Sequence, residues 1–90
     1  MKLTVWNEGI WKPSRFSNSE VRRVSFKSLD KNDKKTYYLN LDNANKGYEQ
    51  WLPYLINGTV LDVQVMPMNG KNIINKFQPF LVVKQIKEKE

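Results

Sequence analysis

Two neighbouring segments of the sequence alternate apolar and polar residues with a period of two, and this pattern constrains the fold most. The apolar members of residues 21–29 and 36–42 fall on one face, which comprises Val24, Phe26, Tyr37, Leu39 and Leu41. The opposite face comprises Arg23, Ser25, Lys27, Tyr38 and Asn40. Residues 30–34 (DKNDK) between the segments are turn formers. The two segments are therefore predicted to form an antiparallel hairpin with one buried face.

Shorter stretches of the same character predict further strands at residues 3–5, 59–66 and 80–84. The first strand can extend past Gly9 to Trp11, with Gly9 as a candidate β-bulge. Residues 67–72 (PMNGKN) are predicted to form a glycine-containing turn. The last strand lies within residues 73–86 and is best placed at 80–84, with Pro79 near its start, where a missing N–H is tolerated.

The period changes to that of a helix between residues 43 and 55. The apolar stripe of this segment has helical spacing and comprises Tyr48, Trp51, Leu52 and Leu55. Asn43 or Asn45 is available as an N-cap. Pro53 either ends the helix near Trp51 or starts a second, tighter turn. A single short helix is predicted. Because Trp51 lies in the apolar stripe of this helix, it is predicted to be a core residue rather than a site residue.

The order of three strands, a short helix and two strands predicts the fold class. Ninety residues support one hydrophobic core, so residues 1–86 are predicted to form a single domain, followed by a charged tail at 87–90 (KEKE). The chain is predicted to be all-β with one short helix, as a five-stranded OB-fold barrel with element order β-β-β-α-β-β. A small SH3-like barrel and an open α+β sheet are the alternatives.

The residue types that most catalytic sites need are missing from the sequence. The chain has no cysteine and no histidine, which excludes thiolate and imidazole metal sites and the usual catalytic base. Its nine acidic residues are scattered. We therefore expect no enzymatic activity, no cofactor and no bound metal.

The charge balance favours a polyanionic partner. Fifteen Lys and Arg against nine Asp and Glu give a net charge of +6, which attracts nucleic acid and also keeps an ordinary small domain soluble. The N-terminal sequence is not that of a signal peptide, and no apolar run approaches membrane-spanning length. We expect a cytoplasmic protein that does not associate with a membrane.

Four segments resemble the small OB-fold single-stranded DNA-binding proteins of bacteriophages and mobile elements. They are VRRVSFKSL (21–29), KTYYLNLD (35–42), NKGYEQWLPYL (45–55) and NGTVLDVQV (57–65). The resemblance covers most of the chain and lies in element order, size and basic charge. It implies non-catalytic, largely sequence-independent binding of single-stranded DNA in replication or recombination.

OB-folds bind single strands on the face of strands two and three, flanked by the loops that join strands one to two and four to five. On this basis the predicted nucleic-acid-binding residues are Lys12, Arg15, Phe16, Arg23, Lys27, Tyr38, Asn40 and Lys71. Aromatic rings in this set would stack on bases, and the cations would contact phosphates. Ordinary structural roles compete with this interpretation: Tyr38 as a cross-strand packing partner, Phe16 as a loop anchor, and Arg23 and Lys27 as solvated strand residues.

Other functions remain open on the sequence alone. The stacking platform also suits RNA, and exposed aromatic residues suit a protein-interaction module such as a small inhibitor or assembly factor. Trp6 and Trp11 are left open between core, interface and stacking platform. A homo-oligomer, in the first place a dimer formed through an exposed edge strand, is also expected.

Overall fold

The computed structural model describes residues 1–86 as mostly β-structure with one short helical segment. The predicted tail at residues 87–90 lies outside the described residues. The strands are β1 (Lys2–Asn7), β2 (Lys12–Pro13), β3 (Glu20–Ser28), β4 (Thr36–Asp42), β5 (Val60–Asp62), β6 (Val65–Met68), β7 (Lys71–Ile74) and β8 (Leu81–Lys84). Two 3₁₀-helices, η1 (Tyr48–Gln50) and η2 (Leu52–Tyr54), separate β4 from β5. The prediction of a largely β fold with one short helix is confirmed.

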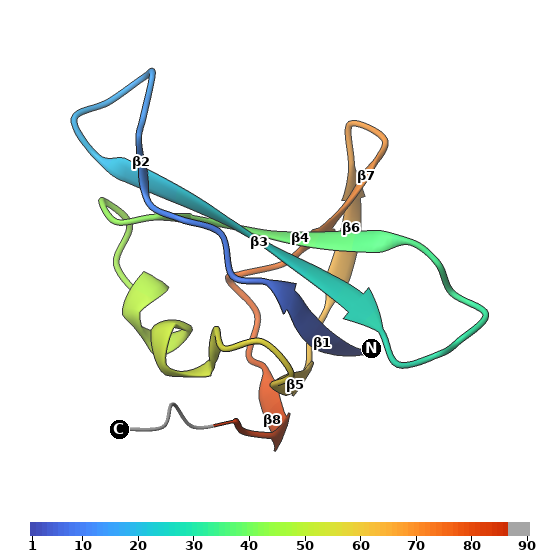
Figure 1. Cartoon of the computed structure of the whole chain (residues 1–90). Coiled ribbons are helices and arrows are strands. Elements are labelled where there is room, and N and C mark those ends of the chain that lie inside the picture. Colours follow the sequence, from blue (N-terminus) through green and yellow to red (C-terminus); the bar gives the residue numbers. More distant parts are fainter. Residues whose placement is uncertain (87–90) are drawn as a thin grey trace.

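The strands form one curled sheet that remains open (Figure 1). Its order is β6-β7-β4-β3-β1-β5-β8, and β2 pairs with the N-terminal end of β3. The neighbours are antiparallel except for β4 and β7, which are parallel. Strands β5 and β6 are separated only by residues 63–64, yet they pair with opposite regions of the sheet, β5 with β1 and β6 with β7.

The predicted hairpin is confirmed as β3 and β4, the longest pair in the sheet. Their register places Val24 opposite Leu39 and Ser25 opposite Tyr38. Alternation then sends the apolar residues into the core, where Val24, Phe26, Tyr37, Leu39 and Leu41 are at most 2% exposed. The buried cluster also takes in Leu3 and Val5 of β1 and Leu61 of β5. The core therefore lies inside the curl of the sheet.

The helical segment is shorter than the predicted range of 43–55. Gly47 adopts a left-handed backbone with φ of 94°, so helical structure begins only at Tyr48. Pro53 lies in the first turn of η2, which matches the expectation of a second, tighter turn. Asn43 does not cap the segment, because its side-chain oxygen accepts the backbone N–H of Glu20 at 3.0 Å.

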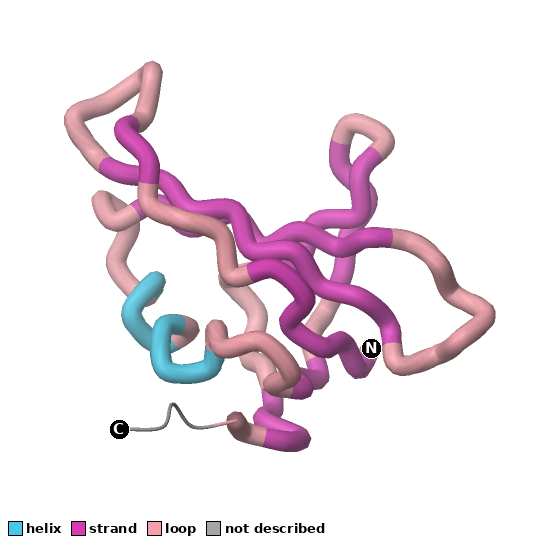
Figure 2. The backbone as a smooth tube through the Cα atoms, in the orientation of Figure 1, coloured by secondary structure: helices cyan, strands magenta, loops and turns pink. Residues whose placement is uncertain are grey.

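The helical segment closes one end of the curl (Figure 2). Trp51 is 1% exposed and stacks on Phe80, with the two ring centres 4.0 Å apart. Tyr54 meets the same Phe80 ring edge-on at 5.7 Å. Trp51 is therefore a core residue, as its place in the apolar stripe predicts.

The sheet has eight strands where the sequence predicts five. Strand β1 ends at Asn7 and does not continue to Trp11, because Gly9 turns the chain with φ of +68° close to β3. Strand β2 at residues 12–13 is an additional strand, in the segment expected to join the first two predicted strands. Residues 59–66 divide at Val63–Gln64 into β5 and β6. Residues 71–74 form the additional strand β7, which the turn at Asn69–Gly70 joins to β6, and both turn residues have positive φ. Divided strands of two to four residues carry too short an alternation to be recognised in sequence.

The two ends of the sheet differ in composition. Strand β6 contains Pro67, which is expected at a sheet edge. Strand β8 exposes three consecutive apolar residues, Leu81 at 69%, Val82 at 40% and Val83 at 48%. Within residues 1–86, no helix combines the length and the apolar character that crossing a membrane requires.

Candidate nucleic-acid interface

The outward face of β3 and β4 carries a network of polar side chains around one aromatic ring. Arg23 donates from Nε to Oδ1 of Asn40 at 3.1 Å. The same guanidinium carbon lies 5.3 Å from the centre of the Tyr38 ring. Tyr38 is half-buried and Arg23 is exposed. The hydrogen bond holds the guanidinium near the ring, so a cation and a π-face are presented together.

A second ring and cation lie further along the same face. Lys27 donates from Nζ to the Thr36 hydroxyl at 2.6 Å, and Nζ lies 4.9 Å from the centre of the Trp6 ring. The register of β1 against β3 shifts between Val5 and Asn7, so Trp6 is the extra residue of a β-bulge. Its side chain is 60% exposed, whereas Val5 is 3% exposed. Trp6 therefore belongs to the outward face, a role that the sequence left open.

The outward face continues onto β7 and β6. Tyr38 pairs with Ile73, and Ile73 pairs with Met66. Paired residues in neighbouring strands project from the same side of a sheet, so these two apolar residues extend the surface beside Tyr38. We call the surface formed by Trp6, Lys27, Arg23, Tyr38 and Asn40 the outer binding face.

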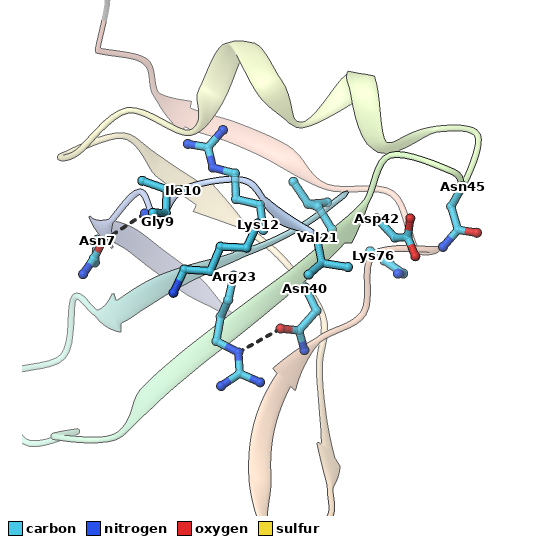
Figure 3. A pocket seen from close by; sticks show the side chains of 12 residues that line it. Asn7, Gly9, Ile10, Lys12, Val21, Arg23, Asn40, Asp42, Asn45 and Lys76 are labelled. Atoms are coloured by element: carbon cyan, nitrogen blue, oxygen red, sulfur yellow. Dashed lines mark hydrogen bonds between the residues drawn. The ribbon is translucent and has the colours of Figure 1, made fainter. Parts of the chain in front are cut away.

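A cavity of about 810 Å³ opens beside the outer binding face, where β2, β3 and β4 meet the β1–β2 connection. It is lined by Asn7, Gly9, Ile10, Lys12, Val21, Arg22, Arg23, Asn40, Leu41, Asp42, Asn45 and Lys76. Figure 3 shows Asn7 and Gly9 at one end of this cavity and Asp42, Asn45 and Lys76 at the other. Four of the lining residues are cations and one is an acid, so the cavity favours an anionic ligand.

The acid in this cavity is held as a carboxylate by local contacts. The backbone N–H of Ala44 donates to Asp42 at 2.9 Å and is the main reason that the pKa of Asp42 lies below its ordinary value. The Ser19 hydroxyl and the charge of Lys76 lower this pKa further, while desolvation opposes them. Asp42 thus orders the turn after β4 and partly balances the charge of Lys76.

Gly9 lets the β1–β2 connection lie directly on β3. A Cβ at this position would stand 2.1 Å from the backbone oxygen of Arg23. Arg22, on the inward side of β3, donates from Nε to the backbone oxygen of Glu8 at 2.7 Å and ties the connection down. This close approach forms one wall of the cavity. Arg22 is therefore a positioning residue that sequence reasoning did not single out.

The structure brings five of the eight predicted site residues together. Arg23, Lys27, Tyr38 and Asn40 lie on the outer binding face, and Lys12 lines the cavity beside Arg23. Arg15 and Phe16 lie in the loop of residues 14–19, where Phe16 is 97% exposed. Lys71 is exposed on the β6–β7 hairpin. Figure 2 shows this loop and this hairpin projecting above the sheet on opposite sides. Phe16 thus does not fold back as a loop anchor.

Besides Arg22, sequence reasoning missed Lys76 and left Trp6 unplaced on this surface. For Trp6 a signal existed, because Leu3 and Val5 alternate with Thr4 and Trp6 and so place Trp6 on the outward side. For Lys76 the local sequence holds no such signal, because it lies in an irregular connection after β7.

Metal chemistry finds no support in the described part of the chain, where no three His, Cys, Asp or Glu side chains are grouped so as to hold an ion. A comparison of the chain with family models, curated proteins and solved structures finds no match. The function therefore has to be inferred from the residues and their arrangement.

Proposed function

We propose that this protein binds single-stranded DNA without catalysis and without base-sequence preference, in the cytoplasm, during replication or recombination. The observation that carries the proposal is the pairing of rings and cations on the outer binding face, Tyr38 with Arg23 and Trp6 with Lys27. Every base offers a π-face and every nucleotide a charge, so such pairs hold a single strand of any sequence. Bases in a duplex are already stacked and are not available to these rings.

The two kinds of contact contribute differently to binding. Stacking on one ring contributes about 1–3 kcal/mol per base, so Tyr38 and Trp6 would supply most of the affinity. Each phosphate contact releases counterions and sets the salt dependence, with a slope of about −0.7 per phosphate for single strands. Lys12 and Arg23 face the cavity and are the natural phosphate contacts.

We further propose that the fold is a partly open five-stranded OB barrel. Its first barrel strand is formed by β1 together with β2, the second by β3 and the third by β4. The fourth is formed by β5 together with β6, and the fifth by β7. The pairings run from β6 through β7, β4 and β3 to β1, and β1 also pairs with β5. Because residues 63–64 join β5 directly to β6, the two ends of this path are linked through the chain. Such a link, with a helical segment between the third and fourth barrel strands, fits an OB barrel. Strand β8 is an addition to it.

The proposal is tested by titrating labelled oligo-dT and a duplex of equal length at about 50 and 200 mM salt, the range in which phosphate contacts show. We expect preference for the single strand and weaker binding at the higher salt. Tyr38→Ala should weaken binding by about 1–3 kcal/mol, while Tyr38→Phe retains the ring and the affinity. Equal binding to the duplex, or equal affinity of both variants, would contradict the proposal. Oligo-U of the same length distinguishes an RNA preference.

A second candidate function is that of a protein-interaction module. It is favoured by the full exposure of Phe16 and by the apolar run Leu81–Val83 on the edge strand β8. Such residues anchor protein interfaces. An interface of this kind loses little affinity between 50 and 200 mM salt, whereas binding through phosphates weakens steeply. The same titrations therefore separate the two functions.

A further inference from the structure

The connection between β7 and β8 presents an exposed aromatic ring with a cation beside it. Phe77 is 77% exposed. Its backbone N–H donates to the side-chain oxygen of Asn75 at 3.1 Å, and the N–H of Gln78 donates to the backbone oxygen of Asn75 at 3.3 Å. These two bonds form a turn that holds Phe77 outward. Nζ of Lys76 lies 5.4 Å from the centre of the Phe77 ring.

This ring and cation adjoin the cavity beside the outer binding face. Lys76 lines that cavity together with Arg23 and Asn40, at the end opposite Asn7 (Figure 3). Lys76 also lines a smaller cavity of about 160 Å³, which Phe77 borders. The two cavities share Leu41, Asp42, Asn45 and Lys76. A linear ligand that runs from the outer binding face along the larger cavity therefore reaches Lys76 and then Phe77.

We propose that Lys76 and Phe77 form a distal subsite for nucleotides of the same DNA strand that lie beyond those stacked on Tyr38 and Trp6. The inference rests on the proposed function and deepens it, because it assigns the path of the bound strand across the surface and a second stacking position. Phe77 repeats the arrangement of the outer binding face, an aromatic ring with a cation about 5 Å from its centre.

The electrostatics of the distal subsite suit a phosphate. The smaller cavity is lined by the two cations Lys46 and Lys76 and by the single acid Asp42. The carboxylate of Asp42 is already occupied by the backbone N–H of Ala44 at 2.9 Å. A phosphate that follows the base on Phe77 would therefore meet a surplus of positive charge.

The test compares wild type and Phe77→Ala by fluorescence anisotropy on two labelled oligo-dT strands, of about 4 and about 12 nucleotides, near the ends of the range that one OB-fold covers. We expect Phe77→Ala to weaken binding of the long strand by about 5- to 150-fold, the equivalent of one lost stacking contact. Binding of the short strand should change less than about 2-fold, because the outer binding face alone accommodates it.

Further variants separate stacking from general effects. Phe77→Trp should preserve binding of the long strand, whereas Phe77→Leu should weaken it as alanine does. Lys76→Gln should reduce the salt slope of the long strand alone by about 0.7. Leu29→Ala is the matched control, because Leu29 is 51% exposed and borders neither of the two cavities, and it should leave both affinities unchanged.

The outcomes distinguish the two proposals. The distal subsite is wrong if Phe77→Ala weakens the binding of both strands equally or weakens the binding of neither. It is also wrong if the substitution changes only the association state of the free protein, as measured by sedimentation. In each of these cases strand binding at Tyr38 stands. If the wild type binds neither oligonucleotide, the proposed function is wrong and the distal subsite falls with it.

Discussion

The two faces of the β3–β4 hairpin are built from alternate residues of the same strands, and they differ in almost every physical respect. The inward face has an apolar part, in which Val24, Phe26, Tyr37, Leu39 and Leu41 are at most 2% exposed. The outward face carries Arg23, which contacts Tyr38 and Asn40, and Lys27, which contacts Thr36 and Trp6; all of these side chains are at least partly accessible. If the proposed function holds, each strand places stability on one side and recognition on the other, and each can be altered separately.

The strongest test of this separation is a truncation on the inward face. Phe26 is fully buried, so Phe26→Ala removes its packing and leaves a cavity. We expect the free energy of unfolding to fall by about 3–5 kcal/mol, measured by urea denaturation. Tyr38→Ala is the control on the outward face, with an expected loss below about 1 kcal/mol. Similar losses for the two variants would show that the faces are not distinct.

A truncation on the outward face should affect binding instead. Trp6→Ala removes a ring that is 60% exposed, so unfolding should be little altered. Loss of stacking should weaken oligo-dT binding by about 1–3 kcal/mol in an anisotropy titration. Trp11→Ala provides a contrast, because Trp11 packs against Tyr48 with ring centres 5.8 Å apart. Unchanged DNA affinity in Trp6→Ala would show that Trp6 does not contribute to binding of the strand.

The cations of the outward face should act on salt dependence. Arg23→Gln keeps a polar side chain near Asn40 but removes the charge. We expect the slope of log affinity against log salt to become less steep by about 0.7, with unfolding unchanged. Lys2→Gln is the control, since Lys2 is exposed on β1 and borders neither cavity. An equal change in slope for both variants would indicate a diffuse charge effect.

The smallest expected effect concerns Tyr37, a core residue of the inward face that carries a hydroxyl. The Tyr37 hydroxyl donates to Oδ2 of Asp33 at 2.5 Å, and this bond raises the pKa of Tyr37 to about 12. It also makes the largest contribution to holding the pKa of Asp33 below its ordinary value. A raised tyrosine pKa favours the neutral hydroxyl in the folded state. Its contribution to stability is therefore complete below pH 10, the ordinary tyrosine pKa, and is lost as the pH rises towards 12.

The urea midpoint of the wild type should accordingly fall between pH 10 and pH 12, and Tyr37→Phe should show a shallower fall over the same interval. Asp33 acts in the opposite range, because a lowered carboxyl pKa stabilises the fold above the ordinary value of 3.8 and the contribution is lost on acidification below it. Parallel pH profiles for the wild type and Tyr37→Phe would contradict this role of the hydrogen bond.

The regions that the sequence predicted well are those with long, regular patterns. The hairpin, its inward residues and the burial of Trp51 follow from spacing alone. The regions predicted less well are those where short strands form only because a distant partner is present. Strand β7 lies parallel to β4, from which it is separated by the helical segment, β5 and β6, and nothing in its four residues specifies that partner.

The sequence by itself determined which residues of the hairpin face inward and which face outward, because the alternation of side chains along a strand is a local property of the backbone. It also determined the basic charge and the lack of cysteine and histidine. Only the tertiary structure decided that Trp6 projects from a bulge beside Lys27, and that Lys76 lies in the same cavity as Arg23. The order in which strands pair sets these proximities, and that order depends on contacts between residues far apart in the chain.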